Sequence, residues 1–296
     1  MNLFLRGLNS YKLDEIIRKA LEEDIGNGDI TTNGIFDENF FISADLVCKS
    51  KGLLCGIEVF KRVFLFLSPD FKFNFKYNDG DYISKKTKIG EVIGPVKELL
   101  KGERTALNFL QLLSGIATET RKLVEKTEGK FKIYDTRKTH PNLRFLEKYA
   151  VKMGGGENHR EGLYDMILIK DNHIKALTEK EKIDKISAIK KAIQKAKEYT
   201  KGKYKIEIEV ENYDEAVCAY SEGVDIIMFD NSDIDDVRKF CEFKKGKKDC
   251  EIEVSGNIDL KKIEILKKLN IDRVSIGYIT HSPEAVDFSL KIKKAI

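Results

Sequence analysis

The fold is decided by residues 204–231, which read YKIEIEVENYDEAVCAYSEGVDIIMFDN. The two ends, 204–210 and 225–230, predict β-strands, and residues 212–222 between them predict a helix. Such a helix lets the two strands run parallel through a right-handed crossover. The alternation continues outward and predicts a parallel sheet of six β–α units, either doubly wound or closed as a barrel. The other expected strands are 131–136, 165–170, 250–254 and 272–277, and the other expected helices are 142–153, 182–199, 233–242 and 259–269.

Polar residues at the strand ends favour the barrel. Lys138 follows the first strand, Lys170 ends the second, and Glu209, Asp230 and Ser255 lie at the ends of later strands. A barrel builds its active site from the C-terminal rim of all its strands, whereas an open sheet draws mainly on the strands at its switch point. The segment is short for eight complete units, so we expect fewer strands.

Acidic residues also occur inside two of the strands. Glu207 and Glu209 share one parity of strand 204–210, and Glu251 and Glu253 lie in strand 250–254. A buried carboxylate requires a cation or a metal as partner. The barrel interior is therefore predicted to be partly polar.

The first part of the chain has a different rhythm. Residues 11–25 and 101–126 predict helices, while the region from 40 to 100 predicts strands and turns. Within that region, residues 71–76 alternate at period two, which is typical of a half-buried strand.

Length and composition exclude several classes of protein. The 296 residues suffice for one large domain or two ordinary ones. The 53 basic and 49 acidic residues give a net charge of +4 without a long block of one sign, so we expect no nucleic-acid partner. No apolar run approaches the roughly 20 residues that span a bilayer, and Met1–Arg6 begins no sustained hydrophobic segment, so we expect neither a membrane span nor a signal peptide. Five scattered cysteines without a CxxC pair fit a reduced cytoplasm.

Cationic residues gather near three of the strand ends. They are Arg137, Lys138, His159, Arg160 and Lys170. Arginine binds carboxylate and phosphate with two parallel hydrogen bonds, and lysine acts as a compact point charge. This cluster predicts a polyanionic ligand.

Two acids and two glycine-containing turns complete the candidate site. Glu209 and Asp230 end successive strands and predict either ion pairs with the cations or a Mg²⁺ site for a phosphorylated substrate. Ser255-Gly256-Asn257 and Gly277 follow the last two strands. Loops at these positions often bind phosphate through their backbone, and tight β–α turns are the alternative.

Other motifs carry less information. The triplet Gly154-Gly155-Gly156 predicts either a close backbone approach to a ligand or a flexible loop. The four histidines have no HxH or HExxH spacing, so no zinc site is expected. No GxSxG, Walker A or GxGxxG motif stands in a suitable place, which argues against a hydrolase, an NTPase or a dinucleotide-binding protein.

Nine blocks, in order along nearly the whole chain, resemble the quinolinate phosphoribosyltransferase family. The departures at His140, Asn257 and Tyr278 leave every charged site residue in place. The blocks are ERTALNF at 103–109, LSGIAT at 113–118, DTRKT at 135–139, EKYAV at 147–151, GGGENHR at 154–160, GLYDMILIKDNH at 162–173, IIMFDN at 226–231, EVSGNI at 253–258 and SIG at 275–277.

The resemblance implies an α/β fold with two domains. An N-terminal α/β sandwich domain would span residues 1–110, and an incomplete βα-barrel of six or seven strands would span residues 111–282. A last helix, 283–296, would return to the first domain.

The resemblance also implies an activity. The protein would transfer phosphoribosyl from phosphoribosyl pyrophosphate to quinolinate with decarboxylation, giving nicotinate mononucleotide, pyrophosphate and CO₂ in the synthesis of NAD. Mg²⁺ would be the cofactor. The expected assembly is a cytoplasmic homodimer with shared active sites, with a hexamer of three dimers as a larger alternative.

The family's site residues carry over to matching positions. Lys138, Lys170, Glu209 and Asp230 would be catalytic, and Glu209 and Asp230 would face the ribose and Mg²⁺. Arg104 would enter the partner's active site. The quinolinate carboxylates would be held by Arg137, Lys138, His159, Arg160 and Lys170, with Thr136 beside them, and the 5-phosphate by Ser255, Gly256, Asn257 and Gly277.

Two other functions fit parts of the pattern. One is a related barrel transferase that acts on another small acid, such as the homologue found with molybdenum transport genes. The sequence around Asn158-His159-Arg160 and Tyr164-Asp165 favours quinolinate. The other is an inactive barrel that senses a phosphorylated metabolite, and the complete set of charged residues argues against it.

Overall fold

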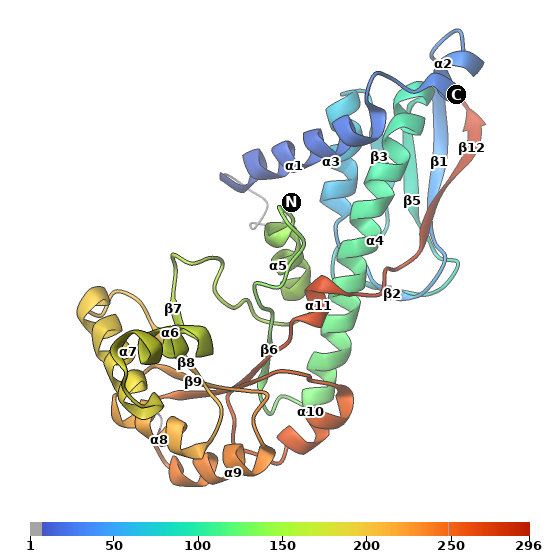
Figure 1. The fold of residues 1–296 in the computed structure, drawn as a ribbon. Helices are drawn as coiled ribbons and strands as arrows, with labels where there is room; N and C mark the ends of the chain where they lie inside the picture. Colours follow the sequence, from blue (N-terminus) through green and yellow to red (C-terminus); the bar gives the residue numbers. More distant parts are fainter. Residues whose placement is uncertain (1–7, 248) are drawn as a thin grey trace. The chain divides into compact units, whose positions relative to one another are not determined.

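The computed structural model describes residues 8–247 and 249–296, so Met1–Arg6, which carried part of the signal-peptide expectation, lies outside the described residues. The chain forms two compact units (Figure 1). The first comprises residues up to Arg121 together with Thr139–Gly155 and Ile279–Ile296. The second comprises Lys122–Lys138 and Gly156–Tyr278. This grouping differs from the ranges 1–110 and 111–282, because residues 111–121, the segment around helix α5 and residues 279–282 all group with the first unit.

The first unit is built on an antiparallel sheet with the strand order β12-β1-β5-β3. Phe60 and Phe64 of helix α3 pack their rings against Phe75 and Phe71. Strand β3 alternates exposed with partly buried residues, so the predicted half-buried strand at 71–76 is confirmed. The elements are α1 Leu8–Ile25, α2 Ile30–Ile35, β1 Phe41–Cys48, β2 Gly52–Leu53, α3 Ile57–Leu67, β3 Lys72–Phe75, β4 Tyr82–Ile83, β5 Lys88–Pro95, α4 Val96–Thr127, α5 Arg144–Met153, α11 Tyr278–His281 and β12 Phe288–Ala295.

The predicted C-terminal helix, 283–296, is wrong. Residues 288–295 form strand β12, which pairs antiparallel with β1 and places Phe288 opposite Cys48 and Leu290 opposite Leu46. Phe288 and Leu290 are buried and Lys291 is exposed, so the apolar residues recur at period two. That period suits a strand and leaves no continuous apolar face on a helix. The C-terminal segment does reach the N-terminal sheet, but as an edge strand.

Helix α3 was not predicted, because its region was expected to hold strands and turns. Val59, Phe60, Val63 and Phe64 are all buried. Their spacing is helical, although β-branched and aromatic residues are typical of strands. The helical spacing of the buried residues therefore decided the structure of this segment, although its residue types favour a strand.

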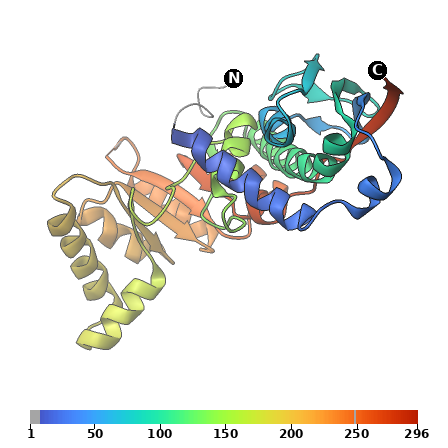
Figure 2. The same ribbon diagram turned by 90° about the horizontal axis from the view of Figure 1, so that it is seen from above.

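The second unit contains a six-stranded parallel sheet with the order β6-β11-β10-β9-β8-β7. All six predicted strands are present, and Figure 1 shows helices α7 to α10 outside them. The view in Figure 2 shows the same strands from above. The elements are β6 Lys132–Tyr134, β7 Ile167–Ile169, α6 Asp171–Glu181, α7 Lys185–Thr200, β8 Ile206–Val210, α8 Tyr213–Ser221, β9 Ile226–Asp230, α9 Ile234–Phe243, β10 Glu251–Ser255, α10 Leu260–Leu266 and β11 Arg273–Ser275.

The barrel is incomplete, as predicted. The strands follow one another in cyclic order, but the sheet ends at β6 and β7, which are not paired among the described residues. Glu157 adds an isolated parallel bridge to Tyr134 on the β6 side of this opening. The segment that follows Gly156 therefore extends the sheet for one residue pair only.

Two further observations concern the helices and the cysteines. Across residues 8–247 and 249–296, no helix has both the length and the apolar character that a bilayer crossing requires. All five cysteines are buried and free of disulfides.

Candidate active site

A cavity of about 430 Å³ lies at the C-terminal ends of the barrel strands. Its walls come entirely from the second unit. The cavity brings together nine residues that the sequence singled out: Thr136, Arg137, Lys138, His159, Arg160, Lys170, Glu209, Asp230 and Ser255. The structure therefore places these nine residues around one cavity at the strand ends, and their roles in binding and catalysis stay predictions.

Cations dominate one part of this cavity. Burial lowers the pKa of Arg160, and the nearby Arg137 lowers it further. The Arg160 guanidinium donates a hydrogen bond to the Met166 carbonyl oxygen at 3.1 Å, which fixes one end of the side chain. Two guanidinium groups close enough to repel each other form a favourable place for an anion.

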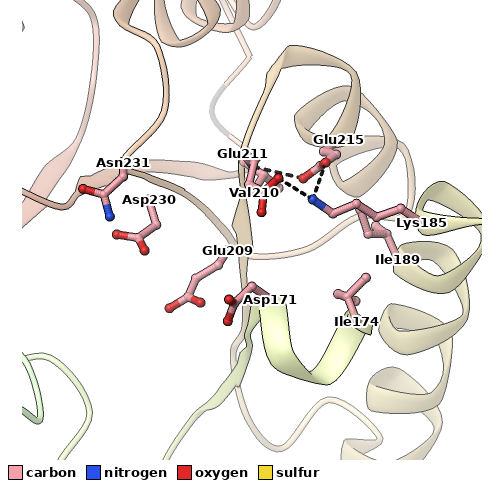
Figure 3. Close-up of a pocket in the computed structure, with 10 residues that line it drawn as sticks. All are labelled: Asp171, Ile174, Lys185, Ile189, Glu209, Val210, Glu211, Glu215, Asp230 and Asn231. Atoms are coloured by element: carbon pink, nitrogen blue, oxygen red, sulfur yellow. Dashed lines mark hydrogen bonds and ion pairs between the residues drawn. The ribbon is translucent and has the colours of Figure 1, made fainter. Parts of the chain in front are cut away.

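Carboxylates also line this cavity, and two of them, Glu209 and Asp230, line a second cavity of about 440 Å³ as well. In Figure 3, Asp171, Glu209 and Asp230 project from the ends of successive β–α units into this cavity. Glu209 forms an ion pair with Lys170. Lys185 lies at 2.7 Å from carboxylate oxygens of both Glu211 and Glu215, away from the three acids.

The three acids could hold a divalent metal. Carboxylate oxygens are the ligands that Mg²⁺ prefers, and Mg²⁺ usually binds one or two of them together with substrate phosphates. The Lys170–Glu209 pair shows that the ion-pair alternative is also realised. Asp171 was not predicted as a site residue, although its place directly after Lys170 at a strand end was the available signal.

The turn after β10 is tightly constrained. Gly256 has a φ of +86°, and a Cβ at this position would lie 2.2 Å from Oδ1 of Asn231. Asn257 is also left-handed, with a φ of 45°. Lys262 of α10 donates a hydrogen bond to the Gly256 carbonyl oxygen at 2.9 Å. Lys262 was missed, since an exposed helix face predicts no role for one lysine among several.

Gly256, Asn257 and Gly277 lie at the ends of β10 and β11 but are not among the described residues that line the two cavities. Arg104 is an exposed residue of helix α4 in the first unit, whereas the cavity walls belong to the second. Gly256, Asn257 and Gly277 are therefore not part of the described cavity walls, and Arg104 belongs to the other unit.

The glycine triplet has a packing role that neither interpretation anticipated. Gly154 is the C-cap of α5, and a Cβ there would lie 2.5 Å from Cβ of Thr120 and 2.7 Å from the Ala117 carbonyl oxygen. Arg121 donates a hydrogen bond to the Gly154 carbonyl oxygen at 3.0 Å. The absence of a side chain therefore permits close contact between α5 and α4.

A buried layer lies beneath the first cavity. Glu207 and Glu253 are fully buried, and Arg273 is nearly so. Burial raises the pKa of Glu207 to about 8 and that of Glu253 to about 7. The Nε of Arg273 lies 3.3 Å from Oε2 of Glu253, and Nε2 of His159 lies 3.1 Å from Oε2 of Glu207. The expected polar interior is present, with an arginine and a histidine as partners.

Comparison with protein families gives two matches that together cover most of the chain. Residues 29–114 match the N-terminal domain of quinolinate phosphoribosyl transferase. Residues 116–291 match the C-terminal domain of the same family.

Individual relatives agree with these matches. The probable nicotinate-nucleotide pyrophosphorylase (carboxylating) of Bacillus subtilis (strain 168) is 40% identical over 286 residues, covering 96% of this chain and 95% of the relative. The protein of the same description from Methanocaldococcus jannaschii is 40% identical over 293 residues, covering 96% and 98%. The crystal structure of NadC from Streptococcus pyogenes is similar with a TM-score of 0.89 and 40% identity, covering 98% and 99% of the two chains.

Proposed function

This chain belongs to the quinolinate phosphoribosyltransferase family, and we propose on that premise how its own residues carry out the reaction. The protein is a nicotinate-nucleotide pyrophosphorylase (carboxylating). It transfers the phosphoribosyl group of phosphoribosyl pyrophosphate to quinolinate with decarboxylation. The products are nicotinate mononucleotide, pyrophosphate and CO₂, and the reaction belongs to the de novo synthesis of NAD.

The observation that carries this function is the charge pattern of one cavity. Arg137, Lys138, Arg160 and Lys170 all line it, together with the carboxylates Glu209 and Asp230. Quinolinate has two carboxylates, and phosphoribosyl pyrophosphate has several phosphate charges. A site that holds both substrates at once requires this excess of cations.

The cations divide into two roles in this proposal. The guanidinium groups of Arg137 and Arg160 bind the quinolinate carboxylates together with Lys138, His159 and Lys170, and Thr136 lies in the same wall. Lys138 and Lys170 are catalytic, because their point charges face the negative charge that develops as pyrophosphate leaves. The contribution of the chain is therefore positioning and electrostatic stabilisation, without a covalent nucleophile.

We further propose that Glu209 and Asp230 hold Mg²⁺ and face the ribose. The support is that both carboxylates line a common cavity with Asp171, so three hard oxygen donors are available. When bound, Mg²⁺ would neutralise charge on the pyrophosphate. Lys170 compensates part of the charge of Glu209.

The bonds change in two steps. The ring nitrogen of quinolinate bonds to ribose C1 as the bond from C1 to the pyrophosphate oxygen breaks. The ring then carries a positive charge, so the adjacent carbon releases its carboxylate as CO₂ and takes up a proton. Ser255, Gly256, Asn257 and Gly277 bind the 5-phosphate in this proposal, and the left-handed turn at Gly256 and Asn257 supports it.

The assembly proposed for the active protein is a homodimer in the cytoplasm, with a hexamer of three dimers as the larger form. Arg104 would serve the partner's site. Its exposed position on α4, in a different unit from the cavity, supports this proposal.

One assay tests the function against its rivals. The protein is mixed with Mg²⁺, phosphoribosyl pyrophosphate and either quinolinate or nicotinate, and both CO₂ and mononucleotide are measured. We expect both products from quinolinate and no turnover of nicotinate. Turnover of nicotinate in preference to quinolinate would favour a related transferase, and binding without turnover would favour the sensor.

A further inference from the structure

The ring of His159 has protein partners on both nitrogens. Nδ1 accepts a hydrogen bond from the backbone N–H of Arg160 at 2.8 Å. A neutral imidazole with Nδ1 as acceptor carries its proton on Nε2. Nε2 lies 3.1 Å from Oε2 and 3.4 Å from Oε1 of Glu207, and 3.7 Å from Oε1 of Glu253, so its N–H faces the carboxyl group of Glu207 most closely.

The main chain around His159 is held at the opening of the barrel. The backbone N–H of His159 donates to Oδ1 of Asp135 at 2.8 Å, and Asp135 follows strand β6. The backbone N–H of Glu157 donates to the Ile133 carbonyl oxygen at 2.7 Å. The backbone is thus tied to β6, and the ring reaches across the interior to Glu207 on β8.

Glu207 lies one layer of side chains below the residues that line the cavity. It precedes Glu209 by two residues on β8, and among the described residues only Glu209 of the two lines the cavity. The charged groups around Glu207 include Arg273 of β11, Arg160, Glu209 and Lys170, and Glu253 of β10 also lies close to it. Glu207 is therefore not expected to contact a substrate in the cavity. His159 and Arg160 do line the cavity, so a change at Glu207 can reach a substrate through these two residues.

A buried metal is the competing interpretation. His159, Glu207 and Glu253 could offer ligand atoms that lie within 4.8 Å of one another. The hydrogen bond to Nδ1 requires a proton on Nε2, however, and a protonated nitrogen repels a cation. Arg273 already supplies a positive charge next to Glu253.

Building on the proposed function, we propose that Glu207 is a positioning residue of the quinolinate site, acting through His159 to fix the main chain of Arg160. Because Arg160 is proposed to bind a quinolinate carboxylate, loss of the contacts that link Glu207 through His159 to Arg160 weakens quinolinate binding selectively. Binding of phosphoribosyl pyrophosphate depends on other strand ends and is unaffected.

Kinetics of two Glu207 variants test the proposal. Glu207→Leu removes the acceptor, and we expect the KM for quinolinate to rise about tenfold while the KM for phosphoribosyl pyrophosphate stays within about twofold. Glu207→Gln keeps an oxygen that can accept from Nε2, so it should restore the quinolinate KM. The matched control is Glu251→Gln, an acid that also pairs with Arg273 but faces no histidine in the described structure. Equal increases in both KM values, or a Gln variant as impaired as the Leu variant, would overturn the proposal.

Nitrogen NMR of His159 in the unaltered protein gives a second test that does not depend on the variants folding. We expect a protonated Nε2 and an unprotonated Nδ1. A proton on Nδ1, or a shift of the Nε2 resonance on addition of Zn²⁺ or Mn²⁺ alone, would overturn the arrangement. Failure of the unaltered protein to convert quinolinate would count against the proposed function instead, because the tautomer is measured without substrate.

Discussion

Arg137 and Lys138 show, at the scale of single residues, what the sequence could predict. Charged side chains at strand ends can be placed from the β–α alternation alone, and nine of the predicted residues line one cavity. Asp171 was missed although it directly follows Lys170 at a strand end, and Lys262 was missed because no local pattern distinguishes it from the other lysines of its helix. The tautomer of His159 also needs coordinates, since its partners are 1 and 48 positions away in the sequence.

Removal of Lys138 should abolish turnover without unfolding the protein. Lys138→Ala, like Arg137→Ala, deletes a charge that lines the cavity, and we expect kcat/KM to fall by about 100-fold or more. Thermal unfolding should be nearly unchanged, which circular dichroism can follow. The control is Lys190→Ala, an exposed lysine of α7. A kcat/KM near that of the unaltered enzyme in either site variant would remove these residues from the active site.

Glu253 should make stability depend on pH. Burial and, to a smaller extent, the nearby Glu207 raise its pKa from an ordinary value of 4.5 to about 7, against the lowering effect of His159 and Arg273. The folded protein therefore keeps this proton at pH values where the unfolded chain has lost it, so the free energy of unfolding falls as pH rises from 4.5 to 7. Above pH 7, Glu253 causes no further change in the free energy of unfolding.

The variant Glu253→Gln cannot ionise and should remove this fall, a difference of up to about 3 kcal/mol between pH 5 and pH 8. Urea unfolding at the two pH values measures it. Glu251→Gln serves as the control, because Glu251 is on the same strand but partly exposed. An unchanged pH dependence in Glu253→Gln would show that the carboxyl group is ionised throughout.

At the scale of secondary-structure elements, the turn from β10 to α10 can be tested separately from the charges. Gly256→Ala adds a Cβ 2.2 Å from Asn231 at a left-handed φ, so the turn must distort. We expect the KM for phosphoribosyl pyrophosphate to rise, with a loss of about 1–3 kcal/mol in binding. In Gly202→Ala the φ is similar, +78°, but nothing lies within 4 Å. If both variants bind phosphoribosyl pyrophosphate equally well, the turn has no part in phosphate binding.

Elements were predicted where their period was clear over a long stretch. All six barrel strands lie within their expected ranges, give or take a residue at each end. Helix α3 and strand β12 were not predicted, for opposite reasons. In α3 strand-forming residues occupy a helical period, and in β12 an implied helix overrode the alternation of Phe288, Leu290 and the lysines. In both cases, the spacing of the apolar residues along the sequence indicates the correct type of element.

At the scale of the whole molecule, the division of the proposed site between subunits is the feature that one chain cannot display. Arg104→Ala and Lys138→Ala should each be inactive alone. If Arg104 acts in the partner's site, a co-expressed mixture contains heterodimers with one intact site, and about a quarter of the full activity returns. Activity measured on the separated variants is the baseline. No recovery in the mixture would place Arg104 and Lys138 in the same subunit's site, and full activity of Arg104→Ala alone would make Arg104 dispensable.

The central claim is that this chain joins phosphoribosyl to quinolinate and removes one particular carboxylate. Quinolinate labelled with ¹³C in the carboxylate next to the ring nitrogen, supplied with Mg²⁺ and phosphoribosyl pyrophosphate, tests it most directly. We predict labelled CO₂ in equal amount to pyrophosphate, with unlabelled nicotinate mononucleotide as the other product. Pyrophosphate without labelled CO₂, or a nucleotide that retains the label, would contradict the account.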